Sequence, residues 1–454
     1  MNNLAFSRQS PPPKRRRKWQ LTPPQALVLG FAGLILTGAL FLNTGWATKT
    51  GAVPGFLTAL FTSTSAVCVT GLVVVDTGTY WSSFGQVVIL LLIQLGGLGI
   101  MTSATLFSIL LGRQIGFKER LMIRESLNQV NVAGVVRLVR YVVLFTVVTE
   151  VFFALVLTLR LSQDITGVKS LWYGVFHAVS AFNNAGFDLF GDFRSITNYV
   201  ADPVVTFGIA LPVIIGGLGF SVISEIVGRR KWRRFTLHAK LAMLTTALLL
   251  VAGTIVFLAL EYHNAMNGLP LPVKMQTAFF QSVAPRTAGF NTVDINALFP
   301  TTLFFLCLLM FIGGSPGSTA GGVKTTTFAL LGLSVSSLVS GRAEAVVFGR
   351  RVPLAQVFKA MTIFFLALSW ISLAVLVLLI FEHKSFLELL FETFSAFSTV
   401  GLSTGVTPDL TPVGRIVIIL TMFVGRLGPL TVAFALAQRR RAVLRYPEEQ
   451  IMVG

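Results

Sequence analysis

Hydrophobic runs of about 20 residues alternate with short polar segments along the whole chain. The runs cover residues 25–43, 84–111, 139–161, 202–227, 239–261, 299–340, 357–381 and 413–436. An α-helix needs about 20 apolar residues to cross roughly 30 Å of hydrocarbon, so each run predicts a membrane-spanning helix. Eight crossings would leave both ends of the chain on one side of the membrane. A large soluble protein with buried helices is the alternative interpretation.

The composition favours the membrane protein. The 454-residue chain has a mean hydropathy of +0.78, and 12% of its residues are charged. A soluble domain usually carries about 25% charged residues. A basic stretch, Pro11 to Lys18, precedes the first run, but no cleavage site with small residues follows it. We therefore expect no signal peptide.

Four short segments interrupt this pattern, and they resemble one another. Each has Phe ten residues before a glycine, Ala five residues before it, and Leu or Phe after it. The segments are "FTSTSAVCVTGL" (Phe61 to Leu72), "FHAVSAFNNAGF" (Phe176 to Phe187), "FFQSVAPRTAGF" (Phe279 to Phe290) and "FETFSAFSTVGL" (Phe391 to Leu402). Their shared register indicates an internal repeat rather than scattered glycines that only help helices to pack.

Each short segment lies between two predicted spans, and its helical part is too short to cross a bilayer. We therefore predict a re-entrant helix followed by an extended turn. Non-helical backbone at membrane depth needs partners for its N–H and C=O groups, or a wet cavity. Four turns around one axis would meet this need, because their carbonyl oxygens could replace the hydration shell of a cation.

The sequence therefore predicts an all-α polytopic membrane protein. It would contain four membrane–pore–membrane repeats, with eight transmembrane helices and four re-entrant pore helices around one pseudo-fourfold pore. The expected division is 1–20 (basic N-terminal tail), 21–115 (repeat 1), 116–232 (repeat 2), 233–342 (repeat 3), 343–438 (repeat 4) and 439–454 (C-terminal tail).

The predicted selectivity filter consists of the glycine and the two residues before it in each repeat. These residues are Val69, Thr70, Gly71, Asn184, Ala185, Gly186, Thr287, Ala288, Gly289, Thr399, Val400 and Gly401. No ring of carboxylates occurs among them, so backbone carbonyls would bind a monovalent cation. Arg286 would repel that ion, and we expect it to face backwards and pair with carbonyls or a carboxylate; Asp188 and Asp294 are candidates.

Charge sets the expected orientation. Of the 36 Lys and Arg residues, 26 lie in the two tails or in 112–140, 229–240 and 342–359, all on the side of the two termini. By the positive-inside rule both termini are cytoplasmic, in a multi-pass plasma-membrane protein. These loops would contact anionic lipid, and this distribution argues against nucleic acid as a partner.

Other chemistry is sparse. Cys68 and Cys307 form no disulfide framework, and neither they nor the four scattered histidines show the spacing of a transition-metal site. No nucleotide-binding motif occurs in the chain: "GGSPGSTAGGVKTTT" (Gly313 to Thr327) lacks the spacing of a phosphate loop. The only ligand that these residues lead us to expect is a monovalent cation.

Several motifs carry a family resemblance. "TSAVCVTGLVVVDTGTYWSSFGQVVILLLIQLGGLGIMT" (Thr64 to Thr102), "RTAGFNT", "GGSPGSTAGGVKTTT" and "RYPEEQIMVG" closely resemble the membrane subunit of Ktr-type potassium-uptake systems, in the Trk/Ktr/HKT superfamily. The resemblance covers residues 20–454. It implies a homodimer seated on a cytoplasmic ring of nucleotide-binding (RCK/KTN-type) regulatory subunits. Glycine at all four filter positions implies a preference for K⁺, and Ktr relatives imply stimulation by Na⁺.

The second half of repeat 3 is interrupted by glycines and a proline, between about 311 and 327. Glycine and proline disfavour a straight helix, so this stretch predicts a flexible loop that obstructs the pore. The family resemblance implies that this loop is an intramembrane gate. A kinked, closely packed helix is the alternative. The candidate gate residues are Gly313, Gly314, Gly317, Gly321, Gly322, Lys324 and Arg426.

Lys324 and Arg426 are cations at membrane depth, which usually face a pathway or a partner. Arg426 resembles the pore-lining arginine of the family, and we expect it to form an electrostatic barrier and to anchor the loop through its carbonyls. Snorkelling or structural pairing is the alternative. The repeated "GGLG" at Gly96 to Gly99 and at Gly216 to Gly219, and "GRLG" at Gly425 to Gly428, predict close packing.

The leading functional hypothesis is passive, gated K⁺ uptake through this filter. A coupled cation symporter is the runner-up, because binding at broken helices would serve it as well. A membrane enzyme is disfavoured, since the apolar segments hold almost no converging acid, base or metal-binding groups.

Overall fold

The computed structural model describes residues 22–99, 102–103, 135–229, 231–342, 344–436, 449 and 451–452. The N-terminal tail, most of the basic loop 112–140 and most of the C-terminal tail lie outside the described residues. Predictions about those segments therefore remain predictions.

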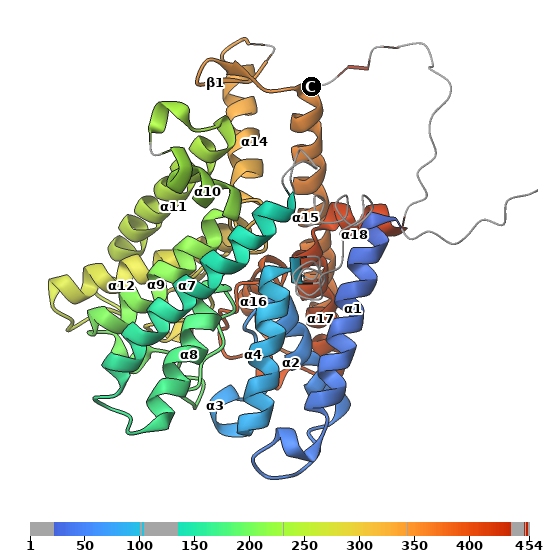
Figure 1. Ribbon diagram of the computed structural model, residues 1–454. Coiled ribbons are helices and arrows are strands. Elements are labelled where there is room, and N and C mark those ends of the chain that lie inside the picture. Colours follow the sequence, from blue (N-terminus) through green and yellow to red (C-terminus); the bar gives the residue numbers. More distant parts are fainter. Residues whose placement is uncertain are drawn as a thin grey trace, which may run out of the picture.

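The described chain is mostly helical, and Figure 1 shows its elements in sequence colours. The first quarter contains α1 (Pro23–Leu42), η1 (Gly45–Ala47), α2 (Phe56–Cys68), α3 (Thr77–Tyr80) and α4 (Ser83–Leu98). The second contains α7 (Val135–Leu161), α8 (Val168–Phe182), η2 (Thr197–Tyr199), α9 (Pro203–Leu218), α10 (Phe220–Arg229) and η3 (Trp232–Arg234).

The second half of the chain repeats this order. It contains α11 (Leu237–Glu261), α12 (Leu271–Val283), η4 (Ile295–Ala297), α13 (Pro300–Phe311) and α14 (Thr325–Val339). A small antiparallel hairpin of β1 (Val346–Val347) and β2 (Arg350–Arg351) follows. The last quarter contains α15 (Leu354–Phe381), α16 (Phe386–Ser398), η5 (Thr407–Asp409), α17 (Pro412–Leu427) and α18 (Pro429–Leu436).

Within the described residues, four helices are each long and apolar enough to cross a membrane: α1, α11, α15 and most of α7. They show many large apolar side chains on their outer faces, such as Leu144, Leu248 and Ile380, which are 66%, 65% and 74% exposed. Such a surface would aggregate in water, whereas lipid tails solvate it. The helical fold with several apolar spans agrees with the predicted class.

The second spans of repeats 2 and 4 are not straight, which differs from the continuous runs that the sequence predicts there. The pairs α9–α10 and α17–α18 bend by 94° and 95°. The bends occur at Gly219 and Gly428, which have φ of +91° and +83°; Gly99, with φ of +81°, ends α4 in the same way. Glycine adopts this backbone without a Cβ clash, so the last glycine of each "GGLG" or "GRLG" motif ends the helix.

The first glycine of each of these motifs provides close packing, as predicted. A Cβ on any of the three would collide with a backbone carbonyl of the preceding short helix. The contacts are Gly96 with Val67, Gly216 with Phe182, and Gly425 with Phe397.

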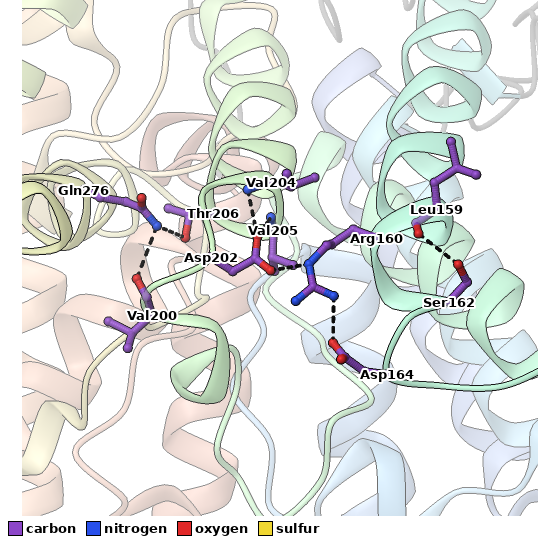
Figure 2. A network of polar contacts seen from close by, with 10 residues as sticks. All are labelled: Leu159, Arg160, Ser162, Asp164, Val200, Asp202, Val204, Val205, Thr206 and Gln276. Carbon is purple, nitrogen blue, oxygen red and sulfur yellow. Dashed lines mark hydrogen bonds and ion pairs between the residues drawn. The ribbon is translucent and has the colours of Figure 1, made fainter.

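Polar contacts at the ends of the spans join the repeats. Figure 2 shows Arg160, from the end of α7, bonded to Asp202, whose Oδ1 accepts hydrogen bonds from the first turn of α9. In the same view Gln276 of α12 donates to Thr206 of α9 at 2.8 Å. The outer end of repeat 2 is thereby tied to repeat 3.

Candidate functional site

The four short helices α2, α8, α12 and α16 lead into four turns that contain the predicted filter residues. The turns comprise 69–71, 184–186, 287–289 and 399–401, and we refer to them as the glycine turns. The helices end at Cys68, Phe182, Val283 and Ser398, within six residues of the glycine. The helices have 13 or 15 residues, as expected for segments that enter a membrane without crossing it.

The backbone of the four turns is alike at two positions. The residue two positions before each glycine is left-handed: φ is 57° at Val69, 59° at Asn184, 69° at Thr287 and 52° at Thr399. Each glycine also has a positive φ, between 71° and 93°. Residues other than glycine rarely adopt this backbone conformation, and such strain is concentrated at functional sites. Its recurrence in four distant segments indicates a common structural role.

The glycine turns form a closed ring, because each glycine lies against the next turn. A Cβ on Gly71, Gly186 or Gly289 would come within 2.5 to 2.8 Å of the neighbouring backbone. The contacts run from Gly71 to Ala185, from Gly186 to Gly289, from Gly289 to Val400 and from Gly401 to Thr70. No side chain larger than hydrogen fits at these positions. Glycine is therefore required because the neighbouring turn is so close, as well as because φ is positive.

The amide groups of the turns point back to their own helices. Thr70 N donates to Ser65 O at 2.8 Å, and Gly71 N donates to Ser65 Oγ at 3.0 Å. In the fourth turn Val400 N and Gly401 N bond Ser395 in the same way, at 2.8 and 3.1 Å.

The carbonyl oxygens of the turns, unlike the amides, lack hydrogen-bond partners among the described residues. Between described residues, none of the twelve carbonyl oxygens accepts a hydrogen bond, although eleven of the twelve residues are buried and Gly401 is half-buried. Buried carbonyls are nearly always paired. This set therefore has the right chemistry to hold a dehydrated cation.

Arg286 faces away from the ring, as predicted. Its guanidinium donates to the carbonyl oxygen of Thr246 in α11 at 3.4 Å, and to the Thr246 hydroxyl at 3.2 Å. Its partners are a carbonyl and a hydroxyl, and neither Asp188 nor Asp294 forms an ion pair with it among the described residues.

The span in repeat 3 is interrupted by a non-helical loop from 312 to 324, between α13 and α14. A kinked helix is therefore excluded. The loop folds back on itself: Gly313 N donates to Val323 O at 2.9 Å, and Thr325 N donates to Gly314 O at 3.1 Å. Gly317 and Gly322 have φ of +68° and +67°, which explains two of the five glycines.

The loop 312–324 touches the glycine turns directly. The Thr319 hydroxyl contacts the Asn184 side-chain oxygen at 2.8 Å, and a Cβ on Gly321 would collide with Thr399. Thr319 N also donates to Gly216 O in α9 at 3.3 Å. Asn184 continues the connection, since its amide lies 3.3 Å from the Thr287 hydroxyl.

Arg426 connects the loop to repeat 1. Its guanidinium donates to the carbonyl oxygens of Thr319, Gly96 and Gly97, the latter two at 2.6 and 3.3 Å. Arg426 thus donates to one carbonyl of the loop, that of Thr319, as predicted, whereas Gly96 and Gly97 belong to α4. Its role as a barrier stays a prediction. The other cation, Lys324, donates to Ala320 O within the loop at 2.6 Å.

A cavity of about 660 Å³ adjoins the loop. Pro316, Ala320, Lys324 and Arg426 line it, together with residues of α1, α11, α14, α15 and α18, but no residue of the glycine turns does. Thr319 and Gly321 of the loop thus contact the ring, whereas Pro316, Ala320 and Lys324 of the same loop line the cavity.

The sequence interpretation did not identify three buried polar residues near the turns or within the spans: Thr319, Glu392 and Glu150. Thr319 is one of several hydroxyls in the loop, and nothing in its spacing distinguishes it. Glu392 in α16 is fully buried and accepts hydrogen bonds from Ser403, Thr404 and Thr407. Glu150 is buried within α7, and its signal was available: it is a carboxyl in the middle of an apolar run.

Known proteins resemble this chain in sequence. The family model described as "Cation transport protein", TrkH, matches residues 6–441. The chain is 42% identical over 440 residues to the Ktr system potassium uptake protein B of Bacillus subtilis, covering 96% of this chain and 98% of that protein. It is 41% identical over 453 residues to the potassium/sodium uptake protein NtpJ of Enterococcus hirae, covering 97% and 99%.

The fold matches a solved structure as well. The crystal structure of the potassium transporter TrkH from Vibrio parahaemolyticus superposes with a TM-score of 0.73 at 20% identity, covering 93% of this chain and 87% of that chain. The fold, the family match and the relatives agree, and this chain is a multi-pass membrane protein that belongs to the TrkH family of cation transport proteins.

Proposed function

We propose that this protein mediates K⁺ uptake by passive permeation through the ring of glycine turns. The unpaired carbonyl oxygens of the twelve turn residues carry this proposal, because they replace the water lost by the ion. The C-terminal ends of α2, α8, α12 and α16 lead into the ring, so their dipoles favour a cation there. The uptake functions named for the relatives in Bacillus and Enterococcus support K⁺, with Na⁺ as a second ion.

The loop 312–324 acts as the gate below this filter. Its contacts with Asn184 and Thr399 place it against the ring, and Arg426 holds it through Thr319. The Arg426 charge also opposes the passage of a cation. Opening requires these hydrogen bonds to break, and a partner that prefers the open state supplies the free energy.

The protein works in the plasma membrane with both termini in the cytoplasm. We propose a homodimer, with the basic loops facing a ring of nucleotide-binding regulatory subunits. The names of the Ktr relatives, which denote components of a Ktr system, support a partner subunit. An inside-negative potential drives uptake with about 2.3 kcal/mol per charge per 100 mV.

The filter is tested by uptake of K⁺, Rb⁺ and Na⁺ into proteoliposomes. The wild-type protein is expected to take up K⁺ and Rb⁺ faster than Na⁺. The Gly71→Ser variant is expected to discriminate less against Na⁺, because its Cβ would push against the Ala185 carbonyl. Gly268→Ser is the matched control: Gly268 has a φ of +77° but no atom within 4 Å of an added Cβ. Equal selectivity in wild type and Gly71→Ser would contradict the proposal.

The competing symporter hypothesis predicts a different voltage dependence. For passive K⁺ permeation the reversal potential follows the K⁺ gradient alone. For a symporter it follows the gradients of both ions at a constant ratio. Currents recorded with varied internal and external K⁺ and Na⁺ separate the two.

The family resemblance implies that the C-terminal tail contributes to the dimer interface, so the dimer is tested there. Removal of the last four residues, Ile451 to Gly454, is expected to weaken the dimer in detergent, which light scattering measures. A dimer of unchanged stability would remove the tail from the proposed interface.

A further inference from the structure

Three of the four short helices carry a fully buried polar side chain that bonds the chain just beyond the glycine turn. These side chains are His177 in α8, Gln281 in α12 and Glu392 in α16. The bonds run from Leu189 N to His177 Nε2 at 3.3 Å, from Gln281 Nε2 to Thr292 Oγ1 at 3.3 Å, and from Thr404 N to Glu392 Oε1 at 2.9 Å. In each repeat the bonded residue lies three positions after the glycine of the turn. We refer to these three contacts as the anchoring bonds.

The three side chains occupy the same place on their helices. In each repeat the amide just before the glycine donates to a carbonyl oxygen of the helix, and the polar side chain lies three residues before that carbonyl. The accepting carbonyls belong to Ser180, Ala284 and Ser395. Counted from the glycine, Gln281 is one residue closer than His177 and Glu392, because the amide bond of repeat 3 spans four residues instead of five. The anchoring bonds are therefore equivalent in three dimensions, although the spacing differs in one repeat.

Repeat 1 has the same place but no anchoring bond. Thr62 lies three residues before Ser65, whose carbonyl accepts from Thr70 N. The Thr62 hydroxyl is buried and has no hydrogen-bond partner among the described residues. An imidazole, an amide and a carboxyl group thus make the same connection in the other three repeats. Because these groups differ in chemistry, what they share is the connection itself.

The contacts of His177 show that the connection needs no charge. His177 Nδ1 lies 2.7 Å from the carbonyl oxygen of Tyr173, which can only accept a hydrogen bond. The Nδ1 atom therefore carries the proton, and Nε2 is left with the lone pair that accepts from Leu189 N. A neutral imidazole meets both partners at once.

The anchoring bonds fix three of the turns from both sides of the glycine. The backbone before the glycine is held by its amide, as in the bond of Ala185 N to Ser180 O at 2.8 Å, and the backbone after it is held by the anchoring bond. The carbonyl oxygens of the ring bear like partial charges and repel one another. Discrimination between K⁺ and Na⁺ depends on the number and placement of such oxygens. Support from behind the turns therefore bears on which ion the ring accepts.

We propose that His177, Gln281 and Glu392 are positioning residues that hold the second, third and fourth glycine turns and thereby increase the discrimination of the ring against Na⁺. This inference rests on the proposed function. A buried hydrogen bond can also serve only to stabilise the fold. The two roles differ in what they change: a purely structural bond changes the amount of folded protein, whereas an anchoring bond changes the ratio of Na⁺ uptake to Rb⁺ uptake.

The anchoring bond of repeat 3 can be removed from either end. Gln281→Leu removes the donor, and Thr292→Val removes the acceptor while it retains the shape of the side chain. Gln276→Leu is the matched control on the same helix, because Gln276 bonds Val200 O and Thr206 of repeat 2 and not the segment after the turn. Initial rates of Rb⁺ and Na⁺ uptake into proteoliposomes are measured at equal amounts of monodisperse protein.

The anchoring bond of repeat 2 is tested by removal and by rescue. His177→Leu loses the acceptor for Leu189 N. His177→Gln offers a side-chain oxygen in place of Nε2, and glutamine is the residue that already makes this connection in repeat 3. A rescue by glutamine would show that the bond matters rather than the imidazole ring.

The ratio of Na⁺ uptake to Rb⁺ uptake is expected to rise about two- to tenfold in Gln281→Leu, Thr292→Val and His177→Leu, as the loss of one hydrogen bond allows. The double variant Gln281→Leu/Thr292→Val is expected to change the ratio no more than either single variant, because both remove the same bond. The ratio of His177→Gln and Gln276→Leu is expected to equal that of the wild type.

An unchanged ratio in the folded variants would overturn the inference, and so would an equal rise in Gln276→Leu or a double variant whose effect is the sum of the two single effects. A ratio as high in His177→Gln as in His177→Leu would remove His177 from the proposed set. If a leucine variant does not fold, Thr292→Val decides, because it retains the shape of the side chain. Absence of cation uptake by the wild-type protein would instead refute the proposed function.

Discussion

The hydroxyl of Thr319 donates a 2.8 Å hydrogen bond to the side-chain oxygen of Asn184, so the loop 312–324 is bonded directly to a residue of the glycine turns. Asn184 in turn lies 3.3 Å from the hydroxyl of Thr287 in the next turn. A movement of the loop would therefore change the hydrogen bonds of two turns at once. In the proposed function, this contact couples the gate to the filter.

Removal of the Thr319 hydroxyl should favour the open loop. Thr319→Val retains the shape of the side chain but loses its bond to Asn184. One hydrogen bond contributes about 0.5–1.5 kcal/mol, so we expect a roughly two- to tenfold increase in Rb⁺ flux into proteoliposomes. Ser334→Ala is the control, because it removes a hydroxyl whose hydrogen bond goes to Leu330 within α14. Flux equal to that of the wild type would show that this bond does not stabilise the closed loop.

Neutralisation of Arg426 should also raise ion flux. Arg426→Gln removes the positive charge and at least one of the three carbonyl contacts that hold the loop to repeat 1. Arg415→Gln is the control on the same helix, since Arg415 donates to the carbonyl oxygens of Leu410 and Pro408 just before the start of α17. Flux is compared at equal expression, and no change in Arg426→Gln would reject its role as a barrier.

Close packing at Gly216 should make alanine destabilising there. A Cβ on Gly216 would collide with the Phe182 carbonyl, and overpacking costs about 1–3 kcal/mol. A Cβ on Gly332 of α14 meets no atom within 4 Å, and alanine is expected to stabilise that helix by about 0.4–1 kcal/mol. The fraction of monodisperse protein after heating in detergent measures both effects, and equal stability of the two variants would contradict the packing argument.

The acid Asp188, in the loop after the second glycine turn, should make stability depend on pH. Burial, together with the charge of Asp76, raises the pKa of Asp188 from 3.8 to about 7; the Tyr173 phenol also faces it. The folded protein therefore binds a proton more tightly than the unfolded chain, and this group's contribution to stability falls as the pH rises from about 4 to 7.

Asp188→Asn cannot titrate and should lose this contribution. Thermal unfolding in detergent at pH 5 and at pH 8 is compared for the two proteins. We expect the wild type to be destabilised more than Asp188→Asn by the change to pH 8. The same pH dependence in both would show that Asp188 does not titrate in this range.

Local patterns predicted much of the fold. The four short helices and their glycines recur at a constant register, and the structure places each helix end within six residues of its glycine. The break in repeat 3 followed from five glycines and a proline in one stretch. The right-angle bends at Gly219 and Gly428 were not predicted, because a glycine within an apolar run packs as readily as it bends.

The sequence by itself determined the helical class, the four short helices that end shortly before a glycine, and where glycine is needed, because these properties depend on nearby residues and on the length of each run. Only the tertiary structure decided which groups meet: Gly71 with Ala185, Thr246 with Arg286, and Glu150 with Asn183. The two partners in each of these contacts are far apart in the sequence, and no common spacing links the three pairs. Their choice depends on how the helices pack, and a buried charge or unpaired carbonyl takes whichever partner the packing brings to it.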